Sequence, residues 1–361
     1  MNGNLRQKPG EGAIARVEEA ASALRRGAFV AVKDASGISA MLAVETASDE
    51  AIAALPGEVF LVLTHARART LKMRLYTQDV VAMKLEKGAR AALLRAIADP
   101  TADLAEPLKG PFDAEREALP ERFAASAKLA KFAGLLPAVV IAREGTIEGA
   151  IEIDSSEIAN YEEAVARSLQ LVTRARVPLE GAKNAELAAF RASNGGPEHY
   201  AIIINNPPTD QPVLTRLHSE CFTGDLLGSL KCDCGAQLRG AIDAIEKAGG
   251  GVLLYLAQEG RGIGLINKLR AYRLQDQGFD TMEANERLGF EADERLYGIA
   301  ARMLSLLGYK SVRLLTNNPD KLTGLEAAGV KVAERVAHSF PDNEHNRAYL
   351  RTKAEKGGHL F

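Results

Sequence analysis

The sequence contains almost no cysteine, and this scarcity argues against a fold that is held together by disulfide bonds. Only three of the 361 residues are cysteine, and all three lie between Cys221 and Cys234. Three cysteines cannot all pair with each other, and Cys232 and Cys234 are too close in sequence for an ordinary bridge, so we expect no disulfide framework. The first residues, MNGNLRQKPGEGA, have no apolar core of the kind that a signal peptide needs. We therefore expect a cytoplasmic protein in a reducing compartment.

Long apolar runs and tryptophan are absent as well. The longest apolar runs, such as 135-LLPAVVIA-142, are far too short to span a bilayer, so no membrane partner is expected. The formal charge of −2 argues against a nucleic-acid partner that is bound through bulk charge. Without tryptophan and with few other aromatic residues, platforms for stacking nucleic-acid bases are also scarce.

Helical and strand patterns follow each other along the chain, which indicates an α/β (α+β) fold. The length favours two domains, each large enough for its own core. In the first half, helical spacing and short apolar runs predict a helix at 15–27, strands at 28–34, 38–46 and 59–64, helical structure over 80–108, a helix at 124–134 and a strand at 137–143.

Alternation becomes clearer after residue 200. Strands are predicted at 200–205, 251–256, 311–316 and 330–336, and helices at 235–249, 292–308 and 319–329. The preceding segment carries Pro, Gly and Asn and ends in the breaker NGGPEH. We therefore predict a first domain over 1–180, a linker over 181–199 and a second domain over 200–361.

The three cysteines follow the spacing Cys-x10-Cys-x-Cys around a glycine-containing turn. Thiolates bind zinc strongly, and a site with three protein ligands keeps one position open for water, as catalytic zinc sites do. His218 could serve as a fourth ligand. The alternative is a set of buried, inert small residues, which the clustering in one segment opposes because free cysteine is usually scattered.

A second block, 258-QEGRGIGLINKLRAY-272, combines glycines with basic residues directly after a predicted strand. Its glycines allow close approach of the backbone, and Arg261, Lys268 and Arg270 supply positive charge, which suits a polyphosphate. It does not match the Walker pattern. A glycine-rich turn with solvated basic residues is the alternative.

Two further blocks place polar residues at helix starts. In 288-LGFEADERL-296, Asp293 and Arg295 are two residues apart, so on a helix they would not share a face and could serve two points of one ligand. In 315-LTNNPDK-321, a strand ends at Thr316 and a helix follows with Lys321 in its first turn, which suits an anion. An ordinary helix cap and an ordinary strand-to-helix turn are the alternatives.

Together these blocks closely resemble GTP cyclohydrolase II, the zinc enzyme that opens the guanine imidazole ring at the start of riboflavin synthesis. The resemblance runs from about residue 200 to the C-terminus. The matching segments are 216-RLHSECFTGDLLGSLKCDCGAQL-238, 258-QEGRGIGLINKLRAYRLQDQG-278, 289-GFEADER-295, 313-RLLTNNPDK-321 and 352-TKAEKGGHLF-361.

The resemblance implies roles for individual residues. Asp293 would be the proton acceptor, Arg295 the proposed nucleophile at the α-phosphorus, and Tyr272 a residue near the reaction centre. One Zn²⁺ per chain would be held by Cys221, Cys232 and Cys234. GTP would contact Arg216, Leu217, His218, Ser219, Glu220, Gln237, Glu259, Gly260, Arg261, Thr281, Thr316 and Lys321.

The implied reaction converts GTP to formate, pyrophosphate and 2,5-diamino-6-hydroxy-4-(5-phosphoribosylamino)pyrimidine in a homodimer. A metal with an open position lowers the pKa of bound water, a placed carboxylate shuttles protons, and cations with Mg²⁺ neutralise the triphosphate. An arginine nucleophile is chemically unusual because its pKa lies far above neutral, so a phosphate clamp remains open for Arg295. A catalytically silent zinc- and nucleotide-binding regulator of the same pathway is the alternative function.

Residues 13–174 more weakly resemble 3,4-dihydroxy-2-butanone 4-phosphate synthase, through 16-RVEEAASALRRGAFVAV-32 and 129-LAKFAGLLPAVVIARE-144. That synthase needs an acidic loop for Mg²⁺, whereas 33-KDASGISA-40 holds one Asp. Its RHG-type motif is absent, and Ala142 or Arg143 replaces an expected glutamate. Without those carboxylates the Mg²⁺ site cannot form. We expect a degenerate domain that serves structure, dimer contacts or regulation, rather than half of a bifunctional enzyme.

Overall fold

The computed structural model describes residues 11–291 and 293–338, and these form two units that are described separately here. The first unit comprises residues up to 161 together with 266–294. The second comprises 162–265 and the residues from 295 onward. Each unit is built around one mixed sheet, six-stranded in the first and seven-stranded in the second, which confirms the α/β class.

The first sheet is formed by the short apolar runs of the first half of the chain. Its order is β4-β3-β5-β2-β1-β6, with β1 and β6 parallel and the other neighbours antiparallel. Buried apolar side chains fill the central strands, which is why these runs form strands rather than surface helices. The strands are β1 (Val30–Asp34), β2 (Gly37–Ala43), β3 (Val59–Thr64), β4 (Val80–Lys84), β5 (Ala138–Ala142) and β6 (Ile151–Asp154).

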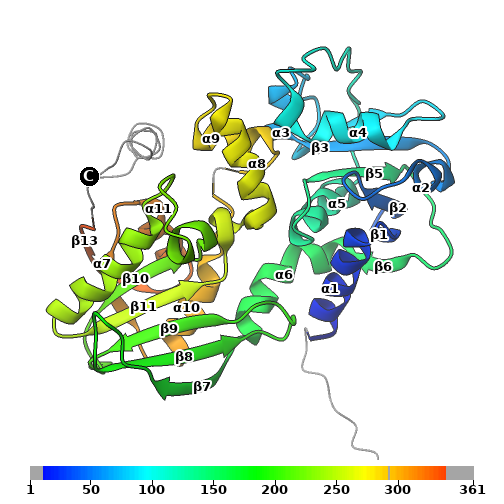
Figure 1. Ribbon diagram of the computed structural model, residues 1–361. Helices are drawn as coiled ribbons and strands as arrows, with labels where there is room; N and C mark the ends of the chain where they lie inside the picture. Colours follow the sequence, from blue (N-terminus) through cyan, green and yellow to red (C-terminus); the bar gives the residue numbers. More distant parts are fainter. Residues whose placement is uncertain (1–10, 292, 339–361) are drawn as a thin grey trace, which may run out of the picture. The chain divides into compact units, whose positions relative to one another are not determined.

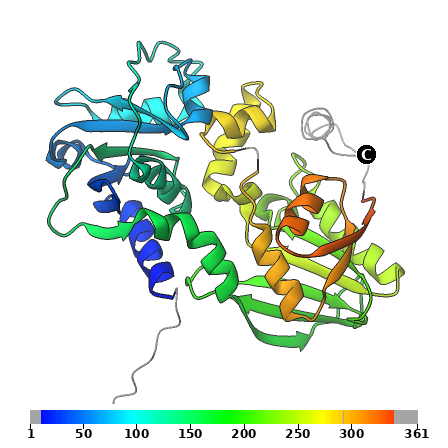
Figure 2. The ribbon, with the colours of Figure 1, turned by 180° about the vertical axis from the view of Figure 1, so that it is seen from behind.

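Helices cover this sheet, and two further helices of the first unit come from late in the chain. Helices α1 and α5 pack against each other and against the sheet (Figure 2). Most of α8 and all of α9 belong to the first unit, and α9 begins with a capping box formed by Asp280 and Glu283. The helices are α1 (Glu11–Arg25), α2 (Asp49–Ala54), α3 (His65–Thr70), α4 (Ala91–Ala98), η1 (Pro100–Ala102), α5 (Glu121–Phe132), α8 (Gly264–Asp276) and α9 (Thr281–Arg287).

The second sheet has the order β13-β12-β10-β11-β9-β8-β7. Strands β13, β12, β10 and β11 run parallel, and β9, β8 and β7 continue the sheet antiparallel. The carboxyl ends of the four parallel strands therefore meet at one edge. The strands are β7 (Gln170–Arg176), β8 (Ala185–Arg191), β9 (His199–Ile204), β10 (Val213–Ser219), β11 (Gly251–Leu256), β12 (Ser311–Leu315) and β13 (Lys331–Val336).

Right-handed crossovers decide which face each helix of the second unit covers. Helix α7 connects β10 to β11 on one face, and α10 and α11 lie on the other (Figures 1 and 2). Beneath α7, the buried residues Ile204, Ile245 and Leu253 form part of an apolar cluster. The remaining elements are α6 (Ser155–Ser168), which begins in the first unit, η2 (Phe222–Leu226), α7 (Cys234–Lys247), η3 (Glu259–Gly262), α10 (Tyr297–Leu306) and α11 (Asp320–Ala327).

Three local expectations differ from the structure. Residues 80–84 form β4 rather than a helix, because their apolar side chains are buried beside β3. The segment 181–199, expected as a linker, contains β8 and the first residue of β9, and β8 pairs with both β7 and β9 in the sheet. Helix α10 begins at Tyr297 rather than 292, so Asp293 and Arg295 precede it. The division at residue 180 stays a prediction, although the sheet of the second unit already starts at Gln170.

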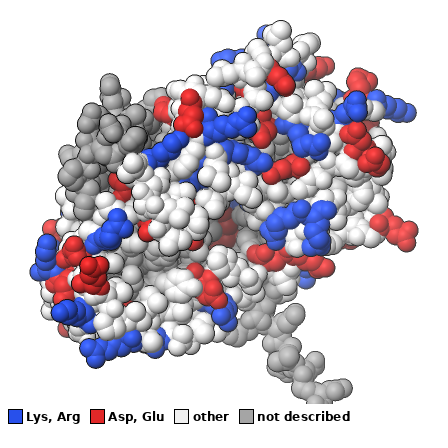
Figure 3. Space-filling model, viewed as in Figure 1, with Lys and Arg blue, Asp and Glu red and all other residues white. Residues whose placement is uncertain are grey.

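The surface offers no large area of one charge on the face drawn in Figure 3, where basic and acidic side chains are interspersed. In the part of the chain that the structure describes, no helix is both long and apolar enough to cross a membrane.

Candidate metal and phosphate site of the second unit

Strand β10 carries the first group of predicted site residues. It lies between β11 and β12, so Arg216 and His218 are 5% and 3% exposed although both are polar. The segments that follow β10, β11 and β12 all leave the same edge of the sheet. This topology explains why the three motif blocks, which lie far apart in sequence, come together.

The three cysteines meet where β10 gives way to α7. Cys221 follows β10, Cys232 lies in the connecting loop, and Cys234 is the first residue of α7. All three sulfur atoms lie within 4.8 Å of one another, and the Sγ atoms of Cys221 and Cys232 are 3.7 Å apart. Thiol groups that converge in this way could hold a metal ion.

Gly224 leaves the space that the thiols need. A Cβ atom at this position would lie 2.7 Å from Sγ of Cys232 and 2.9 Å from Sγ of Cys221. The amide of Gly224 also donates a hydrogen bond of 3.3 Å to Sγ of Cys221. Gly235 is required for a related reason, because a Cβ there would lie 2.4 Å from the carbonyl oxygen of Gly224. Because neither glycine carries a Cβ atom, the loop and α7 can approach closely enough for the three sulfur atoms to lie together.

The electrostatics of the cluster also fit a cation. Hydrogen bonding with Cys221 raises the pKa of Cys232, and it raises the pKa of Cys234 well above its ordinary value, with burial adding to both shifts. Neighbouring thiolates repel each other, so all three ionise together only beside a positive charge. A bound divalent metal supplies that charge.

Asp225 was not anticipated from the sequence, yet it organises the surroundings of the cluster. Its carboxylate lies 3.0 Å from Nε2 of His218 and accepts hydrogen bonds of 3.0 Å from the hydroxyl of Tyr255 and the amide of Cys221. The ring of His218 stacks on Tyr255 with centroids 5.5 Å apart. Burial lowers the pKa of His218, while its hydrogen bond to the carboxylate of Asp225 acts in the opposite direction.

The ring of His218 is therefore oriented by Asp225, and the candidate metal cluster among the described residues contains the three thiols without it. The possibility that His218 is a fourth ligand finds no support in this arrangement. An acidic residue four positions after a candidate ligand was the available sequence signal for Asp225, since carboxylates often orient the side chains around a metal site.

Arg216 is a buried cation with partners on two neighbouring segments. Its Nη1 donates a hydrogen bond of 3.0 Å to the carbonyl of Leu315, and its Nη2 donates to the side-chain oxygen of Gln237. Gln237 in turn donates to Asp233, a further residue that the sequence did not single out. Burial lowers the pKa of Arg216 to about 10, so it stays charged near neutral pH. Its Nε has no hydrogen-bond partner among the described residues.

Lys321 adds a second buried cation. It lies in the first turn of α11, is 7% exposed, and donates a hydrogen bond of 2.7 Å to the carbonyl of Leu217 on β10. Thr316 follows β12 and its hydroxyl accepts a hydrogen bond of 3.0 Å from the amide of Asn318. A buried ammonium and a buried guanidinium at the same sheet edge favour an anionic ligand.

The block after β11 forms a short 3-10 turn with unusual backbone. Gly260 and Arg261 both have φ of +63°, which is rare for a residue with a side chain. The carboxylate of Glu259 accepts hydrogen bonds from the amide of Phe222 at 2.6 Å and from that of Gly260 at 3.0 Å. Glu259 thereby links this turn to the loop that carries Cys221.

The other predicted site residues lie outside this group or at its margin. Tyr272, Thr281 and Asp293 belong to the first unit, where Lys268 lies 5.8 Å from the Tyr272 ring and Gln275 donates to the Thr281 hydroxyl at 3.1 Å. Arg295 belongs to the second unit. Ser219 ends β10, and Glu220 donates its amide to the carbonyl of Leu256. The matching tail 352–361 lies outside the described residues.

Comparisons with known proteins agree with these motifs. The family model described as GTP cyclohydrolase II matches residues 170–337. A GTP cyclohydrolase-2 of Azospirillum brasilense is 50% identical over 366 residues, covering 97% of this chain and 95% of that protein. A riboflavin biosynthesis protein RibBA of Bacillus mycoides is 58% identical over 164 residues, or 45% of this chain and 41% of that protein.

A solved structure matches more loosely. A two-domain 3,4-dihydroxy-2-butanone 4-phosphate synthase from A. baumannii aligns at 18% identity with a TM-score of 0.34, covering 88% of this chain and 99% of that one. A TM-score this low gives no information about shared architecture. The family of the chain therefore follows from the sequence comparisons alone.

Proposed function

Because the chain belongs to the GTP cyclohydrolase II family, we propose that it hydrolyses GTP to formate, pyrophosphate and the diaminopyrimidine product, the first step of riboflavin biosynthesis. The observation that carries this proposal is the convergence of three thiols at the sheet edge that also holds buried cations. Sulfur ligands suit a metal that acts on the ring, and Arg216 and Lys321 suit the triphosphate.

We assign Zn²⁺ to Cys221, Cys232 and Cys234, one ion per chain. When bound in a site with an open position, zinc lowers the pKa of a water molecule and so supplies the hydrolytic nucleophile for the ring. Asp225 orients His218 and the amide of Cys221 around those ligands. The removal of formate requires proton transfer, and we assign that role to Asp293 with Tyr272 nearby, as the family resemblance implies.

The triphosphate end of GTP requires neutralisation of charge. We propose that Arg216, Arg261 and Lys321 bind phosphate oxygens and that Mg²⁺ accompanies the substrate. Arg295 acts at the α-phosphate, where its high pKa favours a clamp over a nucleophile. Contacts to the rest of GTP would come from the other residues that the resemblance implies: Leu217, His218, Ser219, Glu220, Gln237, Glu259, Gly260, Thr281 and Thr316.

The test is an incubation of the purified chain with GTP and Mg²⁺ in which formate and pyrophosphate are followed together. We expect both products in equal amounts. Binding of GTP without either product would instead identify the chain as a silent nucleotide-binding regulator of the pathway.

The first unit, in our proposal, makes no butanone phosphate. At the loop where an acidic Mg²⁺ site would be required, Asp34 pairs with Arg122 at 2.9 Å. The guanidinium of Arg122 is buried and also donates to the hydroxyls of Ser36 and Ser39 at 2.6 and 2.7 Å. Asp34 is the only carboxylate of this loop, and its ion pair with Arg122 opposes the binding of Mg²⁺ there. Formate release from ribulose 5-phosphate with Mg²⁺, in the absence of GTP, would overturn this assignment.

We propose instead that the first unit holds the segment 266–294 in place. Arg270 pairs with Glu45 at 2.8 Å, and Lys131 pairs with Glu294 at 2.6 Å. The hydroxyl of Thr64 donates a hydrogen bond of 2.7 Å to the carbonyl of Gly289. Because this segment contains Tyr272, Thr281 and Asp293, a domain without its own catalytic loop still positions residues that we assign to the GTP reaction.

A homodimer in the cytoplasm completes the proposal, as the family resemblance implies. The mass of the purified chain in solution, measured by light scattering, tests the assembly directly. A mass equal to one chain at micromolar concentration would contradict it.

A further inference from the structure

The first unit contains a pocket that shares no residue with the site assigned to GTP. Its volume is about 630 Å³, within the usual range for small-molecule sites. The walls come from the segment after α3, from the loop between η1 and α5, and from the last residue of α9. Five basic side chains line it (Lys72, Arg74, Lys109, Arg116 and Arg287), against three acidic ones.

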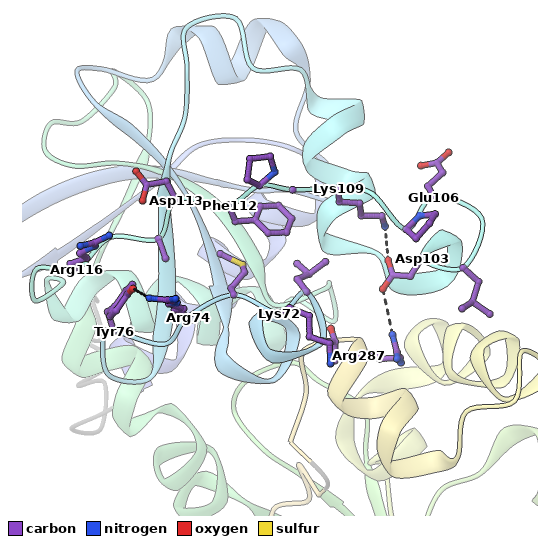
Figure 4. A pocket seen from close by; sticks show the side chains of 18 residues that line it. Lys72, Arg74, Tyr76, Asp103, Glu106, Lys109, Phe112, Asp113, Arg116 and Arg287 are labelled. Atoms are coloured by element: carbon purple, nitrogen blue, oxygen red, sulfur yellow. Dashed lines mark hydrogen bonds and ion pairs between the residues drawn. The ribbon is translucent and has the colours of Figure 1, made fainter.

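Positive charge is in excess at one end of this pocket. Asp103 accepts hydrogen bonds from the buried Arg67 at 2.6 Å and from Lys109 at 2.5 Å, and Arg287 lies 3.7 Å away. Burial acts to raise the pKa of Asp103, but the hydrogen bonds and charges of Arg67 and Lys109 lower it. Asp103 therefore faces three cations, of which Figure 4 draws Lys109 and Arg287, and this leaves positive charge for a ligand.

The other end combines cations with an aromatic ring. Arg74 donates a hydrogen bond of 3.3 Å to the hydroxyl of Tyr76, and Arg116 lies 5.4 Å from the centre of the same ring. Phe112 lies between the two ends (Figure 4). Within residues 11–291 and 293–338, neither Arg74 nor Arg116 forms an ion pair with a carboxylate. Arginines of this kind, with rings beside them, suit phosphate oxygens and a planar group.

Lys72 supplies a further, independent indication. It follows α3 with φ of +60°, and its amide donates to the carbonyl of Arg69, a helix-ending position that favours glycine. A lysine there strains the backbone without a compensating ion pair among the described residues. Strain retained at a pocket wall is expected where the side chain has a binding role.

We propose that this pocket binds an organic phosphate that carries an aromatic ring, of the size of a nucleotide. The phosphate groups contact Lys72, Arg74 and Arg116, and the ring lies against Tyr76 or Phe112. The site is distinct from the predicted GTP site in its residues, and Arg287 connects it to α9, the helix that begins at Thr281.

The experiment is calorimetric titration of the full chain with ADP, repeated with adenosine as the ligand without phosphate. Titrations are also made in a Lys321→Ala background, which weakens binding at the predicted GTP site. One ADP site should remain there, and adenosine should bind at least tenfold more weakly. The double variant Arg74→Ala/Arg116→Ala should weaken that remaining ADP binding at least tenfold, whereas Arg26→Ala, an exposed arginine outside the pocket, should leave it unchanged.

Lys72→Gly separates a binding role from a structural one. Glycine relieves the left-handed backbone, so this variant should keep or raise the Tm while weakening ADP binding several-fold. The proposal is overturned if the Lys321→Ala chain binds no ADP at millimolar concentration. It is equally overturned if the double variant, Lys72→Gly and Arg26→Ala all bind ADP alike.

Discussion

At the scale of single residues, the convergence of the three thiols depends on the absence of a side chain at Gly224. Gly224 contributes no ligand, yet a Cβ at this position would lie within 2.9 Å of two of the three sulfur atoms. The sequence identified the cysteines because thiols are rare in it, but it contained no sign that this glycine faces them. Asp225 had a sequence signal in its position four residues after the candidate ligand Cys221, but its contacts with His218 and Tyr255 exist only once the strands are paired.

Gly224→Ala should therefore separate the sulfur atoms and lower metal content and formate release together. We expect less than a tenth of the formate release of the unaltered chain, measured with elemental analysis of the same preparations. The matched control is Gly298→Ala on α10, where a Cβ would meet only Ala166 at 3.5 Å. That variant should keep its metal, since alanine favours a helix by up to about 1 kcal/mol. Full metal occupancy in Gly224→Ala would refute the packing argument.

Stability should fall in mild acid because of buried neutral histidines. Burial lowers the pKa of His199 to about 4, and its Nδ1 accepts a hydrogen bond of 3.1 Å from the amide of Ala257. The unfolded side chain titrates near 6.5, so between these values the unfolded state binds more protons and stability drops as pH falls. At pH 5 the loss from His199 is roughly 2 kcal/mol relative to pH 7.

Denaturant unfolding of the unaltered chain and of His199→Asn at both pH values measures this effect. Asparagine supplies an acceptor oxygen that does not titrate near neutral pH, so the variant should lose less stability on acidification, by the same amount. His338, whose pKa burial also lowers to about 4, should still contribute its own loss. Identical pH dependence in both proteins would contradict the assignment to His199.

At the scale of elements, the strands and helices that were predicted after residue 200 are present because apolar periodicity is a local property, whereas β10, α8 and α9 were not predicted. Two further differences were decided by pairing between strands, which the composition of a segment does not reveal. Residues 181–199 read as a linker because of their Pro, Gly and Asn, but β8 finds both of its neighbours in the sheet. Residues 80–84 have good helix formers around them, and pairing with β3 overrides that propensity.

The turn after β11 combines a binding role with backbone strain. Arg261 holds φ of +63°, where glycine avoids a cost of about 1 kcal/mol. Arg261→Gly should thus keep or increase stability while raising KM for GTP about tenfold, since a phosphate-binding charge is lost. Asp79→Gly provides the control, because Asp79 has the same φ of +63° and lies in the first unit. Michaelis kinetics showing an unchanged KM in Arg261→Gly would exclude the residue from the substrate site.

At the scale of the whole molecule, the segment 266–294 lies late in the sequence but belongs to the first unit. No sequence signal predicted this, because the resemblance assigned the segment to the GTP cyclohydrolase II half and nothing local reveals its packing. Charged and hydroxyl groups at Glu45, Thr64 and Lys131 hold it through the contacts described above. These contacts are the basis of the positioning role that we propose for the first unit.

Arg270→Ala tests this coupling. Loss of the pair with Glu45, which is about 20% exposed, should cost about 1–3 kcal/mol of stability and raise KM for GTP, because residues assigned to the substrate lie in the same segment. The control is Arg167→Ala, which removes an exposed pair with Glu163 worth no more than about 0.5 kcal/mol. If stability falls in Arg270→Ala while KM stays unchanged, the first unit has no positioning role.

Whether the thiol cluster opens the ring is tested by the ratio of formate to pyrophosphate that Cys232→Ser releases from GTP. We assign ring opening to the thiol cluster and triphosphate cleavage to Arg216, Arg295 and Lys321. The variant should release formate at under a hundredth of the normal rate while still releasing pyrophosphate slowly, so the ratio should fall far below one. A normal rate of formate release from Cys232→Ser would show that the thiol cluster has no part in opening the ring.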